Sequence, residues 1–149
     1  MKTYSELRNG KEITLELPLR VNNGTTRKGK VRKLHLAPSL NKIINLSKNY
    51  RVWATYKKTA EDRIKMEISR QTTEKFDKPV AVTFQRYCVR PLDWDNMGSS
   101  FKFIGDSIVE LGIIKDDDIK HIVKYFPEQY KVAHYDDEKI IIKIFEWEV

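Results

Sequence analysis

The sequence contains one cysteine, three histidines and no long apolar run. Because a disulfide needs two thiols, Cys88 forms none within the chain, which fits a reducing cytoplasm. A lone cysteine with the scattered His35, His121 and His134 argues against a zinc site. No stretch reaches the roughly 18 apolar residues of a membrane span. Residues 1–6 lack the apolar core of a signal peptide.

Size and composition predict one globular domain. Of the 149 residues, 40% are hydrophobic and 11% aromatic, which suffices for a packed core. Periodicity predicts a strand at 11–21, a helix at 47–72 capped by Ser47, a strand at 79–89, a helix at 96–111 ended by Gly112, a strand at 119–125 ended before Pro127, and a strand at 139–149. This mixture indicates an α/β (α+β) fold, a single domain whose mixed β-sheet is packed by two main helices.

Positive charge is concentrated in the first half of the chain. Residues 1–74 hold 17 Lys/Arg and 7 Asp/Glu, a net of +10, whereas residues 75–149 hold 11 and 14, a net of −3. The sum is the +7 of the whole chain. A strongly basic half favours a polyanionic partner such as nucleic acid, although basicity alone is a weak signal.

The most basic short stretch follows an Asn-Asn-Gly loop signal at residues 22–24. It carries five cations, namely Arg27, Lys28, Lys30, Arg32 and Lys33. One interpretation is a solvated hairpin arm, and the other is an arm that contacts DNA phosphates. The sequence leaves both open.

The expected long helix has an apolar and a basic side. Its core-facing residues, at helical spacing, are Trp53, Tyr56, Ala60, Ile64 and Ile68. On the other side, Arg51, Lys58 and Lys65 recur every seven residues. A solvated helix face is the favoured interpretation of these cations, and contact with DNA is the alternative. Tyr50, Trp53 and Trp94 could stack on bases, but we expect them to pack in the core.

An acidic segment interrupts this basic protein. The window 93–118 holds seven acids against Lys102 and Lys115, a net of −5. The acids are Asp93, Asp95, Asp106, Glu110, Asp116, Asp117 and Asp118. Such a cluster near a polyanion makes sense if divalent cations lie between carboxylates and phosphate, because Mg²⁺ binds a few carboxylates and activates water at a phosphodiester.

Helix phasing separates the polar from the apolar residues of this window. Asp95, Ser99, Lys102 and Asp106 form one stripe, opposite the apolar stripe of the same helix. The plainer interpretation is that Asp95 or Asn96 caps the helix and that residues 116–118 form an exposed turn. The two acid clusters lie roughly 24 Å apart along a straight helix. They converge only if the segment after Gly112 folds back.

The motifs of this window resemble those of the RusA family of Holliday junction resolvases. Asp93-Trp94-Asp95-Asn96, then Lys102 with Asp106 four residues later, then Asp116-Asp117, follow the order of the family pattern. The likeness is strong over about 25 residues and weaker from about Leu36 to the C-terminus, so residues 1–35 match less well. One departure is that Ser99 stands where the family pattern has its lysine, so that Lys102 is displaced by ~4.5 Å along the helix.

The resemblance implies a homodimeric, Mg²⁺-dependent endodeoxyribonuclease, with Mn²⁺ able to substitute. It would resolve branched DNA by paired nicks in recombination and repair, in the cytoplasm, and be typical of a prophage or mobile element. Asp93, Asp95 and Asp117 would be the essential carboxylates and, with Asp116, the metal ligands. Lys102 would stabilise charge on the phosphate, while Asn96 and Asp106 would support the site.

Two other functions remain open. One is a non-catalytic nucleic-acid-binding protein with a decayed nuclease site, which the displaced Lys102 favours. The other is a different metal nuclease, acting on flaps or RNA, because metal and carboxylates act on the phosphate and not on the base.

Overall fold

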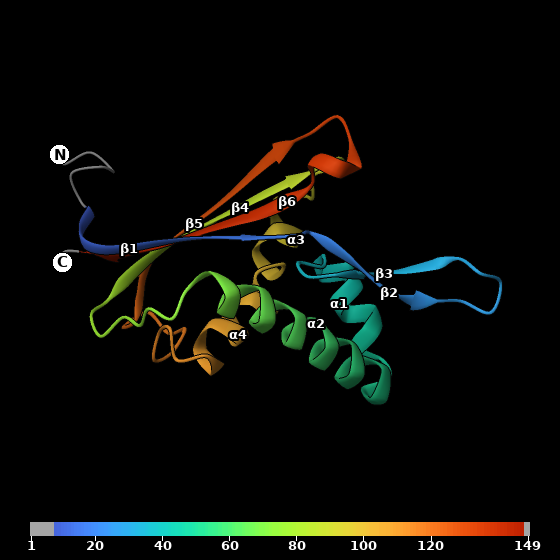
Figure 1. Ribbon diagram of the computed structural model, residues 1–149, viewed down its shortest axis with the longest axis horizontal. Coiled ribbons are helices and arrows are strands. Elements are labelled where there is room, and N and C mark those ends of the chain that lie inside the picture. Colours follow the sequence, from blue (N-terminus) through green and yellow to red (C-terminus); the bar gives the residue numbers. More distant parts are fainter. Residues whose placement is uncertain (1–7, 148–149) are drawn as a thin grey trace.

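The computed structural model describes residues 8–147 (Figure 1). Its strands are β1 (Arg8–Leu17), β2 (Arg20–Thr25), β3 (Val31–His35), β4 (Val80–Cys88), β5 (Ile122–Lys131) and β6 (Lys139–Trp147). Its helices are α1 (Leu40–Ser47), α2 (Tyr50–Gln71), α3 (Trp94–Ser99) and α4 (Lys102–Glu110), with a 3-10 turn, η1 (Tyr135–Asp137). The predicted α+β class with a mixed sheet is confirmed.

The main sheet has the strand order β1-β6-β4-β5. β4 pairs parallel with β5, and the other neighbours are antiparallel. Helices α1, α2 and α4 lie on one side of the sheet (Figure 1). Alternate residues of β6 (Ile140, Ile142 and Ile144) and of β4 (Val80, Val82 and Phe84) belong to the buried core. Ala81 and Thr83, on the other face of β4, are also buried.

Parallel pairing determines the path of the acidic segment. Parallel strands need a crossover connection, because the chain must return to the end of the sheet where the first strand began. Residues 89–121 make that crossover and carry α3 and α4. The strand expected at 119–125 is therefore wrong in its bounds, since residues 119–121 form a turn and β5 runs on through Pro127. β5 is an edge strand, where the missing proline N–H costs no ladder bond.

The helix expected at 47–72 corresponds to α2, which begins three residues later than expected, and a shorter helix that was not predicted, α1, precedes it. α1 ends at Ser47, and α2 begins after Asn49, whose side chain accepts hydrogen bonds from the backbone N–H groups of Arg51 and Val52. The prediction that Ser47 caps the long helix is wrong, because Asn49 supplies that cap. Ser39 caps α1 in the same way. The predicted core face of α2 is confirmed, since Ala60, Ile64 and Ile68 are buried and Trp53 and Tyr56 pack against the core.

The helix expected at 96–111 is divided into two helices. α3 ends at Ser99 and α4 begins at Lys102. The Ser100 hydroxyl donates to the Met97 carbonyl at 2.7 Å, so the side chain competes with the helical backbone pattern. The linking residues Ser100 and Phe101 keep right-handed helical angles. The predicted polar stripe therefore remains on one side of the pair.

The N-terminal strand likewise divides. The expected strand 11–21 becomes β1 and the first residues of β2, with Pro18 and Leu19 between them. Residues 22–33, whose loop signal and cations were interpreted as an arm, form most of the hairpin of β2 and β3, which projects from the body of the molecule (Figure 1). At the other end of the chain, the expected strand 139–149 is confirmed to Trp147. Residues 148–149 and 1–6 lie outside the described residues.

Phe103 joins α4 to α2 in the core, and we expect its truncation to destabilise the fold. Its ring is fully buried and contacts the rings of Trp53 and Tyr56. Phe103→Ala should lower the free energy of unfolding by about 3–5 kcal/mol, measured by urea denaturation. Ile44→Ala, at a residue that is 47% exposed, should change it by less than about 0.5 kcal/mol. Equal losses would contradict this account of the core.

Candidate functional site

The first acid cluster lies at the start of α3. Asp93 is the N-cap residue, but its side chain makes no capping hydrogen bond, and Asp95 lies in the first helical turn. The suggestion that Asp95 or Asn96 caps this helix is therefore wrong. Within the part of the chain that the structure describes, neither carboxylate makes a hydrogen bond or an ion pair. The Asn96 side chain instead accepts from the Asn41 N–H at 3.2 Å, which fixes α3 against α1.

Two aromatic residues near these elements are exposed. Trp94, between the two acids, is 66% exposed, and Tyr50, at the start of α2, is 80% exposed. The expectation that Tyr50, Trp53 and Trp94 pack in the core is wrong for Tyr50 and Trp94 and correct for Trp53. Exposed aromatic rings of this kind can stack on unpaired nucleobases.

The chain folds back after α4. Gly112 adopts a left-handed conformation (φ 73°), and the N–H groups of Gly112 and Ile113 donate to the carbonyls of Val109 and Ile108. This is the glycine-ended cap that stops a helix and reverses the chain. The predicted end at Gly112 is confirmed, and the return segment carries Asp117 to the side of α4.

The second acid cluster contains two different kinds of aspartate. Asp118 accepts from the backbone N–H groups of Lys120 and His121, and its carboxylate lies 2.6 Å from His121 Nδ1, so it organises the turn. Asp116 accepts the Asp117 N–H at 2.7 Å. Burial raises the pKa of Asp117, and the neighbouring Asp116 and Asp106 carboxyls raise it further. Burial and the neighbouring acids thus disfavour the charged form of Asp117.

A cleft of about 540 Å³ brings several of the predicted site residues together. Its polar walls carry Lys102, Asp106 and Asp117, with Gly98 and Ser99 at the junction of α3 and α4. Its apolar lining consists of Leu40, Ile43, Phe101, Ile119, Ile122 and Tyr125. Asp95 lies one helical turn before Ser99 on the same stripe. The cleft therefore gathers Lys102, Asp106 and Asp117 of the sequence motif, whereas Asp93, Asp95, Asn96 and Asp116 do not line it.

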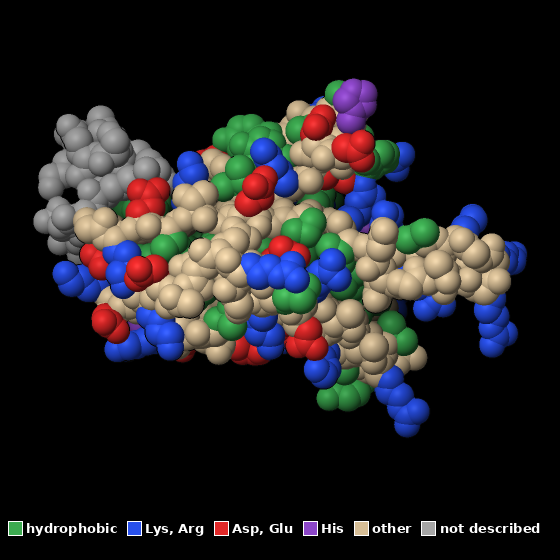
Figure 2. All heavy atoms as spheres, viewed as in Figure 1, with side chains coloured by type: hydrophobic (Ala, Val, Ile, Leu, Met, Phe, Trp, Pro, Cys, Tyr) green, Lys and Arg blue, Asp and Glu red, His purple; other side chains and the backbone are tan. Residues whose placement is uncertain are grey.

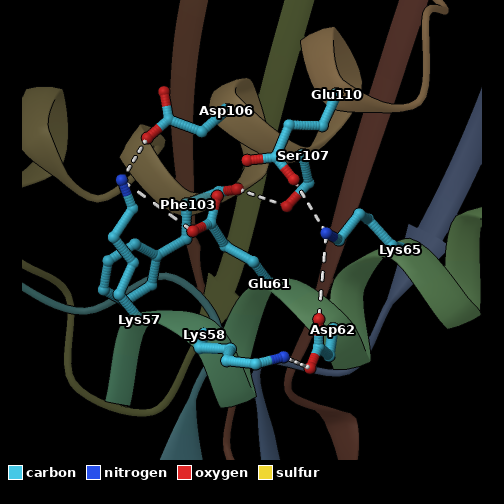
Figure 3. Close-up of polar contacts among 9 residues, drawn as sticks. All are labelled: Lys57, Lys58, Glu61, Asp62, Lys65, Phe103, Asp106, Ser107 and Glu110. Carbon is cyan, nitrogen blue, oxygen red and sulfur yellow. Dashed lines mark hydrogen bonds and ion pairs between the residues drawn. The ribbon is translucent and has the colours of Figure 1, made fainter. Parts of the chain in front are cut away.

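Asp106 connects this cleft to α2 (Figure 3). Its Oδ2 lies 3.1 Å from Lys57 Nζ and 3.6 Å from Lys102 Nζ. Burial disfavours the charged form of Lys57, but its hydrogen bond to Asp106 and the nearby Glu61 outweigh this and raise its pKa. The i, i+4 contact between Lys102 and Asp106 predicted from the sequence is present. Lys57, which the sequence did not single out, holds Asp106 from the opposite side.

The acids do not form a complete metal site as they stand. Among residues 8–147, no group of three or more Asp, Glu, His or Cys side chains is placed to hold one ion. Asp116 and Asp117 lie together, whereas Asp93 and Asp95 lie at the start of α3, beyond the lining of the cleft. The described residues therefore show no preformed Mg²⁺ centre.

The basic arm is the hairpin of β2 and β3. Arg27, Lys28 and Lys30 lie in and beside its turn, and Arg32 and Lys33 lie on β3. All five are exposed, and in Figure 2 Lys and Arg side chains extend from the projecting hairpin at the right. Lys33 donates to Asn22, while no ion pair to any of the five is found within the described residues. The arm thus presents uncompensated positive charge.

The basic residues of α2 are engaged differently. Lys58 Nζ lies 2.9 Å from Asp62, and Lys65 Nζ lies 2.7 Å from Glu110 (Figure 3). These pairs neutralise two members of the predicted stripe, which supports the solvated-face interpretation for them. Arg51 is exposed near the start of α2.

A cationic pocket lies apart from this cleft, and the sequence did not predict it. Arg86 lies on the core face of β4, continuing the alternation Val80, Val82, Phe84, yet it is only 5% exposed. An arginine on an otherwise apolar face was the available signal, because a buried guanidinium needs partners. The pocket that it lines lies at the base of the basic arm.

Substituting Asp116 tests the contact between the paired acids. Asp116→Asn removes a carboxylate that disfavours ionisation of its neighbour, so the pKa of Asp117 should fall. The measurement is an NMR titration of the Asp117 carboxyl carbon. Asp77→Asn, the same change in an exposed loop, should leave this pKa unchanged. A pKa of Asp117 that is unaltered by Asp116→Asn would show that the two acids do not interact.

No protein-family model matches this chain, and no curated protein matches it. In residues 8–147, no helix is both long and apolar enough to cross a membrane. The function of the chain therefore has to be inferred from its residues and their arrangement.

Proposed function

We propose that this chain is an endodeoxyribonuclease that cuts branched DNA and requires Mg²⁺, with Mn²⁺ as a substitute. The observation that carries the proposal is the fold-back after Gly112, by which Lys102 and Asp117 line one cleft. A lysine beside carboxylates at an open cleft is a combination suited to hydrolysis of a phosphodiester, because the cation offsets charge that develops on the phosphate.

Three surfaces support the choice of nucleic acid as the substrate. The basic arm would hold backbone phosphates without regard to sequence. The exposed rings of Trp94 and Tyr50 offer platforms for unstacked bases, which branched DNA provides at its junction. Lys102 would approach the scissile phosphate from the cleft. The unpaired carboxylates Asp93 and Asp95 would repel DNA unless a cation intervened.

The finer points of the proposal rest on the resemblance to RusA resolvases. These are the four-way junction as substrate, the homodimer that makes paired nicks, the use of Mg²⁺, and a role in recombination and repair. A two-fold symmetric junction is matched by two sites related by symmetry. Asp93, Asp95 and Asp117 would then be essential, with Asp116 and Asn96 in support.

A second candidate is a nucleic-acid-binding protein without catalytic activity. It is favoured by the incomplete gathering of acids among the described residues and by the Lys102–Asp106 contact, which occupies the lysine with an internal partner. The basic arm would serve this function equally well. The two candidates differ only in whether DNA is cut.

A cleavage assay separates these candidates. A labelled four-way junction is incubated with the protein, with and without Mg²⁺, beside a linear duplex of the same sequence. The proposal predicts paired nicks in the junction alone, which depend on Mg²⁺. Asp95→Asn and Asp117→Asn should abolish them, and Lys102→Met should slow them roughly 100-fold.

The control substitution is Asp77→Asn, which makes the same chemical change in an exposed loop outside the lining of the cleft and should leave the rate unchanged. Junction binding without cleavage under all these conditions would favour the non-catalytic candidate. Cleavage that survives Asp117→Asn would place the chemistry elsewhere on the molecule.

A further inference from the structure

The pocket at the base of the basic arm lies apart from the cleft described above. It has a volume of about 330 Å³ and is formed where β2, β3 and the end of β4 meet the first turn of α1. Arg20 and His35 come from the hairpin, Ser39 and Lys42 from α1, and Arg86 from β4. None of its lining residues is shared with the cleft that holds Lys102 and Asp117.

Arg86 is the central observation. Its guanidinium is buried, and its Nε and Nη1 atoms have no hydrogen-bond partner among residues 8–147. It contacts the thiol of Cys88, a neutral group because burial raises the pKa of that thiol. A buried guanidinium without an ion pair is costly, because its charge has lost water and gained little in return. Such a donor is stabilised when an anion enters the pocket.

The pocket carries a strong excess of positive charge. Four cations line it (Arg20, Lys42, Arg86 and Arg90) against one carboxylate, that of Glu138. That carboxylate is already engaged, since it accepts from Arg20 and from the Val89 N–H. Burial and the charges of Arg20, Lys42 and Arg86 lower the pKa of His35 to about 4, so the imidazole is neutral at pH 7.

The shape of the pocket selects among anions. Arg86 and His35 lie deep, whereas Lys42, Arg90 and Tyr135 are exposed at the rim. An anion that reaches Arg86 must therefore carry its charged group at one end of the molecule, so that this group can enter first. The Tyr135 ring lies 4.5 Å from the Arg20 guanidinium, so a planar group beside the anion would meet an aromatic surface at the rim.

We propose that this pocket binds a terminal phosphate group, a phosphate monoester carried by a nucleotide or by the end of a nucleic-acid strand. A monoester carries about −1.5 to −2 charges and three acceptor oxygens at pH 7, which suits a net charge of +3 and the fork of a guanidinium. An internal phosphodiester is linked on both sides and cannot enter as deeply. The N-terminus of α1, capped by Ser39, adds backbone N–H groups at the wall of the pocket.

Binding can be measured without any nuclease activity. Isothermal titration calorimetry in EDTA compares thymidine 5′-monophosphate, inorganic phosphate and thymidine. The two phosphates should bind and thymidine should not. Phosphate binding should also raise the pKa of His35, read from its ring resonances, because an adjacent anion favours imidazolium. Equal binding of thymidine and its monophosphate, or no binding of either phosphate at millimolar concentration, would overturn the proposal.

Two substitutions on one helix provide a matched comparison. Lys42→Gln removes a cation from the pocket rim, and Lys48→Gln removes an identical charge at the other end of α1. Lys42→Gln and Arg90→Gln should each weaken phosphate binding about tenfold, and Lys48→Gln should not. Equal weakening of phosphate binding by both lysine changes would show that the net charge of the protein, and not the pocket, attracts phosphate, which would contradict the proposal. Arg86→Met should abolish phosphate binding, and thermal denaturation checks that this variant still folds. If it does not fold, Lys42→Gln and Arg90→Gln still test the proposal.

The source of the phosphate is read from oligonucleotides. A short labelled strand is tested by fluorescence anisotropy in EDTA with a phosphate at its 5′ end, at its 3′ end, or at neither. Tighter binding of a phosphorylated strand than of the unphosphorylated strand identifies a strand end, and equal binding of the two strands identifies a free nucleotide. Asp117→Asn should bind phosphate like the unaltered protein, so failure of the proposed nuclease function would leave this result intact.

Discussion

Parallel pairing of β4 with β5 determines where both acid clusters of this protein lie. It obliges residues 89–121 to leave one end of the sheet and return to the other. That crossover holds both acid clusters, so the start of α3 and the turn at 116–118 are separated by two short helices. Only the reversal at Gly112 carries Asp117 back along α4 to the cleft.

The same arrangement places the basic features around the crossover. The end of β4 carries Arg86, the hairpin of β2 and β3 contributes the arm, and α1 lies between the cationic pocket and the cleft. Its Leu40 and Ile43 line the cleft, while its Ser39 and Lys42 line the pocket. A strand held by the arm with its end in the pocket would therefore pass close to α3 and its unpaired carboxylates. The two proposals are compatible on geometric grounds but rest on different residues.

The sequence predicted the elements better than their ends. Strong periodicity identified β4, β6 and the core face of α2, because burial on one side leaves a repeating pattern. It did not reveal α1, since that helix lacks buried residues. It also missed the break between α3 and α4, where the Ser100 hydroxyl donates to the Met97 carbonyl, and the continuation of β5 through Pro127, which an edge position permits.

The candidate site was predictable as a set of residue types but not as a geometry. Lys102 and Asp106 are four residues apart on one helix, so their contact follows from the sequence alone. The approach of Asp117 to Lys102 and Asp106 depends on the chain reversal after Gly112, and the local sequence pattern does not give the direction in which the chain returns. Lys57 was missed because its partner, Asp106, comes from a distant segment of the chain. Arg86 was missed because its surroundings also come from distant segments, and two of its nitrogens have no partner among the described residues.

The central claim is that both acid clusters belong to one functional surface. Titration with Mn²⁺ tests it most directly, because a bound paramagnetic ion broadens the NMR signals of nearby amides. The account predicts that one binding event broadens residues 93–95 and 116–117 together, along with Lys102. Broadening of 116–117 alone, or of scattered acids such as Asp62 and Asp136 to the same extent, would contradict it.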